Sequence, residues 1–131
     1  MTELQEQISL IKQARMHPIC RTYLLAFSNG GKRSKITGAH MKMSGQVKGT
    51  PDLFLAYPSG KFHGLFIELK RPASKIPGHK SRSKGELTAE QMIMIKYLND
   101  AGYKATVAYG AEQAWKIITE YLANGNGKNP I

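Results

Sequence analysis

The chain has 131 residues, enough for one domain with a single core, and its lysines and arginines outnumber its acids to give a formal net charge of +10. No apolar run approaches the roughly 20 residues that span a bilayer, and the polar start does not resemble a signal peptide. The lone Cys20 excludes an internal disulfide and, without companion ligands, a zinc site.

A net charge of this sign favours a polyanionic partner, nucleic acid first and an anionic membrane surface second. The basic residues fall in loops rich in Gly, Pro and Ser and not on one face of an amphipathic helix, which argues against the membrane. We therefore expect a cytoplasmic protein that binds nucleic acid.

The first predicted element is an amphipathic helix over residues 2–16, with Thr2 available as N-cap and His17-Pro18 as its end. Four residues at helical spacing form its expected stripe: Leu4, Ile8, Ile11 and Arg15. Glu3 lies beside this stripe, so its carboxylate can point into a cleft beneath the first turn.

A short strand is predicted over residues 23–27, and Ser28-Asn29-Gly30-Gly31 indicates the turn that ends it. The next stretch, residues 32–48, carries five basic residues and no acid. Within it we expect a short helix over residues 37–43, which ends at Gly45.

Residues 53–57 and 65–69 are compact apolar runs, and the Pro58-Ser59-Gly60-Lys61 segment between them predicts a β-hairpin. Asp52 opens the first strand and Glu68 closes the second. Side chains alternate along a strand, so Glu68 and Lys70 should emerge on one face and address one point.

The segment of residues 71–86 combines basic residues with Pro, Gly and Ser, and we expect a basic, mobile surface loop. Thr88 and Gln91 form a capping box, which predicts a helix from there to about residue 101. Gly102 is placed to end that helix. Two further elements are predicted: a strand over residues 103–109 and a helix over residues 112–122.

This order of elements indicates an α/β fold of the α+β kind, a mixed sheet flanked by helices. We expect one domain over residues 1–123 and a flexible tail over residues 124–131. Trp115 and the six methionines are expected to fill the core.

Acids are sparse in the first 85 residues, where most of the basic residues lie. They are four in number: Glu3, Glu6, Asp52 and Glu68. A hard divalent cation takes oxygen ligands, and two or three protein carboxylates suffice because it keeps several waters. Asp52, Glu68 and the backbone carbonyl of Leu69 could supply these ligands, and Lys70 would orient or activate an attacking water.

Pro51-Asp52 followed by Glu68-Leu69-Lys70 resembles the signature of the PD-(D/E)xK nuclease superfamily. Over roughly the whole chain, a wider set of motifs is similar to its VRR-NUC branch, the virus-type replication-repair nucleases: Glu3 to Gln7, Asn29-Gly30-Gly31, Gly49-Thr50-Pro51-Asp52, Phe66-Ile67-Glu68-Leu69-Lys70-Arg71, Thr88 to Gln91 and Gly102-Tyr103. The resemblance implies a restriction-endonuclease-like fold and a Mg²⁺- or Mn²⁺-dependent deoxyribonuclease, with no small-molecule cofactor beyond the metal.

By the same resemblance Asp52 and Glu68 are the principal metal ligands, and Lys70 is the catalytic lysine. Gln91 completes the catalytic site, although its capping role alone explains it. Glu3 is the metal-supporting acid of the first helix, a role for which Glu6 competes. Contacts with nucleic acid are expected from one asparagine and nine basic residues: Asn29, Lys32, Arg33, Lys35, Lys48, Arg71, Lys75, Lys80, Arg82 and Lys84.

Free-standing members of this branch occur in phages and prophages, are similar to Holliday-junction resolvases and tend to act as homodimers. The resemblance thus implies a homodimer that cuts branched DNA in the cytoplasm of a bacterial host. Two alternatives stay open: a non-catalytic nucleic-acid-binding module, and a partner-dependent subunit of a phage replication or packaging complex. The long basic segment of residues 71–86 departs from the branch and puts the substrate preference in doubt.

Overall fold

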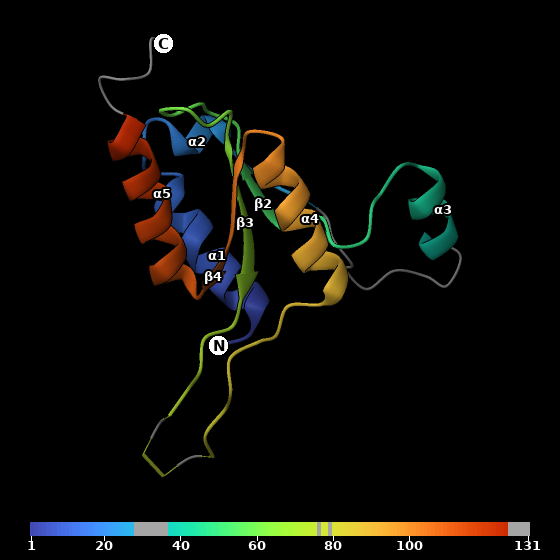
Figure 1. Ribbon diagram of the computed structural model, residues 1–131. Coiled ribbons are helices and arrows are strands. Elements are labelled where there is room, and N and C mark those ends of the chain that lie inside the picture. The colour runs from blue at the N-terminus through green and yellow to red at the C-terminus, as the bar shows by residue number, and fades with distance from the viewer. Residues whose placement is uncertain (28–36, 76, 79, 126–131) are drawn as a thin grey trace.

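The computed structural model describes residues 1–27, 37–75, 77–78 and 80–125 and has a four-stranded mixed sheet at its centre (Figure 1). Its strands are β1 (Leu24–Ala26), β2 (Leu53–Leu55), β3 (Leu65–Lys70) and β4 (Lys104–Tyr109). They lie in the order β1-β2-β3-β4, in which β1 and β3 are antiparallel to β2 and β4 is parallel to β3. The parallel pair is joined through a helix, as a parallel connection requires.

The described helices are α1 (Glu3–Ala14), α2 (Cys20–Tyr23), α3 (Thr37–Met43), α4 (Ala89–Asp100) and α5 (Ala111–Gly125). In Figure 1, α1 and α5 cover one face of the sheet, α4 covers the other and α3 stands apart from both layers. The α/β prediction is therefore confirmed, and the predicted helices and strands agree with the structure to within a few residues at their ends. None of the described helices is long and apolar enough to cross a membrane.

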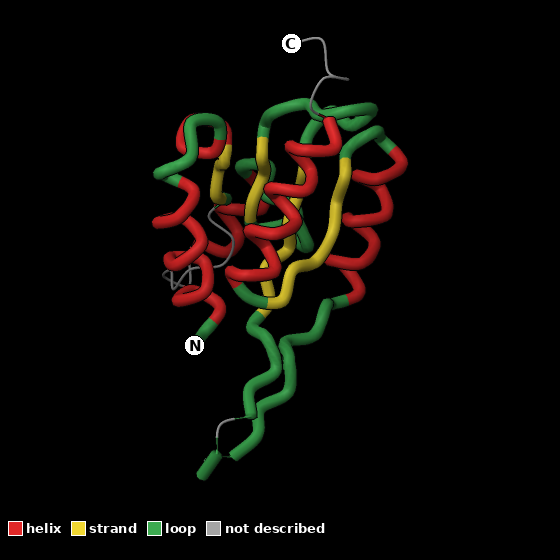
Figure 2. Tube along the Cα trace, turned by 90° about the vertical axis from the view of Figure 1, so that its left-hand side faces the viewer, coloured by secondary structure: helices red, strands yellow, loops and turns green. Residues whose placement is uncertain are grey.

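The described residues of the segment 71–86 leave the end of β3, extend away from the sheet and return to α4 (Figure 2). We call this segment the basic arm. Its two sides are joined by an antiparallel bridge between Ser74 and Arg82. Most of its described residues are exposed, whereas Gly85 is buried at its base. Its mobility stays a prediction.

The core lies between the sheet and the α1/α5 layer. Alternate side chains of the hairpin strands point into it and are almost fully buried: Leu53, Leu55, Leu65, Ile67 and Leu69. On the opposite face, the rings of Phe54 and Phe66 stack with their centroids 4.2 Å apart, and Tyr103 packs edge-on against Phe66. Both faces of β3 are thus covered by apolar groups, which leaves any polar side chain on this strand in need of a partner.

The predicted buried stripe of α1 is wrong. Leu4 and Ile8 are 67% and 47% exposed, whereas Leu10 and Ala14 are completely buried. Both stripes repeat at helical spacing, so periodicity alone does not distinguish them. The small Ala14 side chain lets α1 approach its neighbours closely, and packing against α5 and β3 selects this side of the helix.

The prediction that the six methionines fill the core is also wrong. Four of the six are more than half exposed, and none is among the buried residues of the described chain: the exposed ones are Met1, Met16, Met43 and Met92. Met16 follows the end of α1, and Met43 lies on a helix set apart from the sheet, so neither position faces the core. Trp115 is half-buried and packs against the core, close to its predicted role.

Candidate active site

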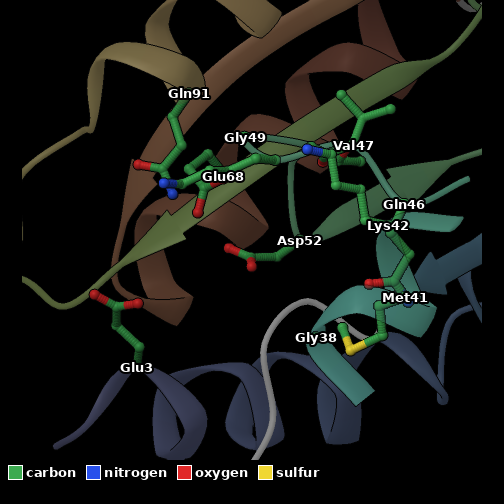
Figure 3. Close-up of a pocket in the computed structure, with 12 residues that line it drawn as sticks. Glu3, Gly38, Met41, Lys42, Gln46, Val47, Gly49, Asp52, Glu68 and Gln91 are labelled. Carbon is green, nitrogen blue, oxygen red and sulfur yellow. The ribbon is translucent and has the colours of Figure 1, made fainter. Parts of the chain in front are cut away.

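A cleft of about 740 Å³ opens where the first turn of α1, the segment after α3, the hairpin strands and the start of α4 meet. Figure 3 shows side chains from all of these elements around one space. The lining residues are Glu3, Gly38, Met41, Lys42, Gln46, Val47, Lys48, Gly49, Thr50, Asp52, Glu68 and Gln91. Four of the residues that we predicted to act together, Glu3, Asp52, Glu68 and Gln91, therefore share one cavity although they lie up to 88 positions apart in the sequence. Lys70 and Leu69 are not among the residues that line it.

Two carboxyl groups lie side by side in this cleft, because the register of the hairpin places them opposite each other. Leu53 pairs with Ile67, which puts Asp52 next to Glu68 one residue further along. One oxygen of Asp52 accepts a hydrogen bond from the backbone N–H of Leu69 at 2.8 Å. The side chain of Asp52 is thereby fixed against β3.

The Glu68 side chain is 2% exposed, and its Oε1 atom is buried without a hydrogen-bond partner among the described residues. Burial is the largest cause that raises the pKa of Glu68, and the hydrogen bond and charge of Asp52 raise it further, to about 9. The nearby Lys70 acts in the opposite direction, and the charge of Glu3 adds a smaller increase. Without a cation, the pair therefore keeps a proton at neutral pH.

Lys70 lies two residues after Glu68 on the same strand and is also buried. Within the described parts of the chain, no carboxylate is in salt-bridge contact with its ammonium group. Its aliphatic stem packs against Gly85, where an added Cβ would meet the Lys70 Cβ and Cδ atoms at 3.4 Å. The ammonium therefore lowers the pKa of Glu68 without an ion-pair partner among the described residues.

The structure separates the roles of the two acids of α1. Glu3 lines the cleft, and its Oε2 atom lies 3.1 Å from the position of a Cβ at Gly85. Glu6 is buried elsewhere, and its Oε1 atom accepts the backbone N–H of Ala111, the first residue of α5, at 2.8 Å. A carboxylate at a helix N-terminus satisfies a free N–H and complements the helix dipole. Glu6 therefore anchors α5 to α1, and Glu3 is the acid of this helix that faces the cleft.

Glu3 does not complete a three-carboxylate cluster. Across residues 1–27, 37–75, 77–78 and 80–125, no three His, Cys, Asp or Glu side chains are grouped closely enough to hold a metal ion. Asp52 and Glu68 are brought together, and Glu3 lies in the same cleft outside their immediate contact (Figure 3).

Truncation of the two acids of α1 should have different effects. Glu6→Ala removes a buried, charge-assisted hydrogen bond to a helix end, so we expect the free energy of unfolding to fall by about 1–3 kcal/mol. Glu3→Ala should change it by less than about 0.5 kcal/mol, because Glu3 is exposed. Urea unfolding of the two variants measures this difference. Equal losses of stability in the two variants would contradict the anchoring role of Glu6.

Gln91 and Gly49 meet at the wall of the cleft. The Oε1 atom of Gln91 accepts the backbone N–H of Thr88, so the predicted capping box is confirmed, and the same side chain lines the cleft. Gly49 has a φ of +92° and lies so close to the first turn of α4 that a Cβ would sit 2.5 Å from the carbonyl oxygen of Glu90. The glycine lets the chain pass α4 and reach Asp52, which directly precedes β2.

The predicted nucleic-acid contacts have different outcomes. Four of them, Asn29, Lys32, Arg33 and Lys35, lie outside the described residues. Lys48 lines the cleft, with its Nζ atom 3.7 Å from a carboxylate oxygen of Glu90. Arg71 is half-buried, and its Nε atom is buried without a partner among the described residues. The other four are exposed on the basic arm: Lys75, Lys80, Arg82 and Lys84.

Several residues near the site were not predicted from the sequence, among them a lysine and a glycine. Lys42 reaches the cleft from α3, and Gly85 separates Glu3 from Lys70 at the base of the basic arm. Lys42 belongs to the basic stretch of residues 32–48, and nothing in the sequence indicates that this stretch lies near Asp52. Gly85 ends a run of basic residues, a position that is as typical of an ordinary turn.

Comparisons with known proteins show the family of the chain. The family model of the VRR-NUC domain matches residues 3–112, a range that contains Glu3, the carboxylate pair, Lys70 and Gln91. A solved structure described as a VRR-NUC domain protein superposes with a TM-score of 0.77 at 25% identity, over 95% of this chain and 91% of that chain. No curated protein matches. The chain therefore belongs to the VRR-NUC family and carries a nuclease domain.

Proposed function

We propose that the protein is a metal-dependent DNA endonuclease that hydrolyses phosphodiester bonds at the Asp52–Glu68 pair. The observation that carries this proposal is the buried Glu68 carboxyl group, which adjoins Asp52 and leaves one oxygen without a partner among the described residues. Two adjacent acids in a buried setting are costly unless a proton or a cation lies between them. The high net positive charge of the chain supports DNA as the substrate.

The donor set fits a hard divalent cation such as Mg²⁺ or Mn²⁺. Asp52 and Glu68 would hold it, together with the backbone carbonyl of Leu69, and two carboxylates suffice because such ions keep several waters. When bound, the cation acidifies a water and stabilises charge on the phosphoryl oxygens. Lys70 would donate hydrogen bonds to the attacking water or to the phosphate, and its buried position keeps competing solvent away. Gln91 would complete the wall of the site.

Branched DNA, of the Holliday-junction kind, is the proposed preferred substrate, and a homodimer is the proposed active form. Both rest on the analogy with free-standing members of the branch. A two-fold symmetric dimer would present two clefts to opposite strands, which is what paired cuts demand. Size-exclusion chromatography with light scattering, and cleavage of labelled four-way junctions beside plain duplexes of equal length, test these two points separately.

The proposed chemistry is tested by Asp52→Asn, with Asp100→Asn as a matched control. Asp100 is exposed and pairs with Lys96 on α4, outside the cleft. With Mg²⁺ or Mn²⁺ we expect the wild-type protein and the control to cleave DNA, and Asp52→Asn to lose about three orders of magnitude in kcat/KM, or roughly 4 kcal/mol of transition-state stabilisation. Equal rates in the two variants would disprove the site. Salt-sensitive binding by all three proteins without any metal-dependent product would instead favour a non-catalytic module.

A further inference from the structure

Hydrogen bonds join the two sides of the basic arm, close its base and connect it to the N-terminus of the chain. Its middle is tied by two backbone hydrogen bonds between Ser74 and Arg82, of 2.7 and 2.8 Å. Its base is closed by the N–H of Gly85, which donates to the carbonyl of Arg71 at 3.0 Å. The guanidinium of Arg82 also donates to the backbone carbonyl of Met1. These contacts fix the direction in which the arm leaves the domain.

Among the described residues, no lysine or arginine of the arm forms an ion pair with an acid. Its lysines and arginines are accompanied by a single acid, Glu86, at its end. The ion pairs found in the described parts of the chain, Lys48–Glu90 and Lys96–Asp100, both lie outside it. Lys84 packs over the ring of Tyr109 at 4.7 Å, a contact that holds the ammonium without neutralising it. A row of exposed cations of this kind is complementary to a phosphate backbone.

The base of the arm adjoins the cleft, because Gly85 lies against Glu3, which lines it. Arg71 directly follows Lys70, and Gly85 packs between Lys70 and Glu3. From Arg71 to Gly78 the chain can extend by about 3.3 Å per residue, which amounts to about 25 Å. Phosphates along one strand of duplex DNA are spaced by about 3.4 Å along the axis. The arm can therefore follow a duplex for about seven base pairs, starting from the cleft.

We propose that the basic arm binds the phosphate backbone of duplex DNA on one side of the cleaved bond, out to about seven base pairs. The inference rests on the proposed function, because the cleft defines the position from which the arm extends. It makes the DNA-binding site asymmetric and longer than the cleft, and it requires a double-stranded flank on the side of the arm. The arm thus selects substrates by the length of duplex beside the cut.

The first test compares two triple variants in the full-length, cleavage-deficient Asp52→Asn background. The arm variant replaces Lys75, Lys80 and Lys84 by glutamine. The matched control makes the same change at three exposed lysines away from the arm and the cleft, Lys12, Lys61 and Lys116, so the net charge is identical. Fluorescence anisotropy over a range of salt concentrations should show that the arm variant lowers the slope of log Kd against log salt by about two to three, with less change in the control. Equal slopes would overturn the proposal.

The second test varies the duplex flank from four to sixteen base pairs on either side of the site. For the Asp52→Asn protein, affinity should rise with flank length on one side up to about seven base pairs and then level off. The arm variant should bind all lengths alike. A length dependence that persists in the arm variant would overturn the proposal. Both readouts measure binding without cleavage, so loss of the arm effect and failure of the nuclease assay are separate results.

Discussion

Replacement of Glu68 by glutamine should abolish metal-dependent cleavage and, in the metal-free protein, make stability less sensitive to alkaline pH. Both effects have one cause, since Glu68 is a buried acid that shares its site with Asp52. Glutamine keeps the shape of the side chain and removes its charge. The activity should fall by at least about three orders of magnitude, because the ligand set for the cation loses a carboxylate.

The pH dependence follows from the direction of the pKa shift. The pKa of Glu68 is raised from its ordinary value of 4.5 to about 9, chiefly by burial, so the folded state binds the proton more tightly than the unfolded state. This contribution to stability is complete below pH 4.5 and is lost as pH rises toward 9. A tenfold difference in proton affinity is worth about 1.4 kcal/mol, which shifts the Tm of a domain of this size by roughly 3–5 °C.

Thermal unfolding between pH 6 and pH 9.5 in the presence of a chelator measures this effect. The Tm of the wild-type protein should fall across the range, and the Tm of Glu68→Gln should fall less. Glu120→Gln, an exposed substitution on α5, is the control and should follow the wild type. Addition of Mn²⁺ should restore the wild-type Tm at high pH, because the ion replaces the proton between the two carboxylates, and should not restore that of Glu68→Gln. Parallel curves for all three proteins would contradict the shifted pKa.

A second large effect is expected from Gly49→Ala. A Cβ at this position would lie 2.5 Å from the carbonyl oxygen and 2.6 Å from the carbonyl carbon of Glu90, both backbone atoms that a rotamer change cannot move. The backbone φ of +92° adds about 1–2 kcal/mol for a residue with a side chain, and the forced displacement adds about 1–3 kcal/mol. Because the displaced segment carries Asp52, cleavage should fall as well.

Gly45→Ala separates the two contributions. Gly45 has a similar φ of +99°, but no atom lies within 4 Å of its Cβ position. Urea unfolding should therefore show a loss of about 1–2 kcal/mol for Gly45→Ala from the backbone alone, and a clearly larger loss for Gly49→Ala. Cleavage should be retained by the first variant and reduced in the second. If both variants lose the same stability, the close packing of Gly49 against α4 is not rigid.

The carboxylate pair could be predicted from the sequence because it depends on neighbouring strands. The Pro-Ser-Gly-Lys segment joins two apolar runs, so the runs pair as a hairpin, and the acid before one strand meets the acid near the end of the other. The capping box of Thr88 and Gln91 was equally predictable, since its interactions span three residues. Interactions between residues close in the chain leave few alternatives, and the residue types alone then determine the result.

The choice between Glu3 and Glu6 could not be made in this way. Both lie in the first turn of α1, and the helix has two apolar stripes at the same spacing. The sequence by itself determined that the acids Asp52 and Glu68 and the lysine Lys70 would lie at two adjacent strands of a basic chain. The tertiary structure decided which side of α1 is buried, and hence that Glu6 binds the end of α5 while Glu3 faces the cleft. The physical reason is that a helix is oriented by the surfaces it packs against, and these surfaces come from β3 and α5, which lie far along the chain from α1.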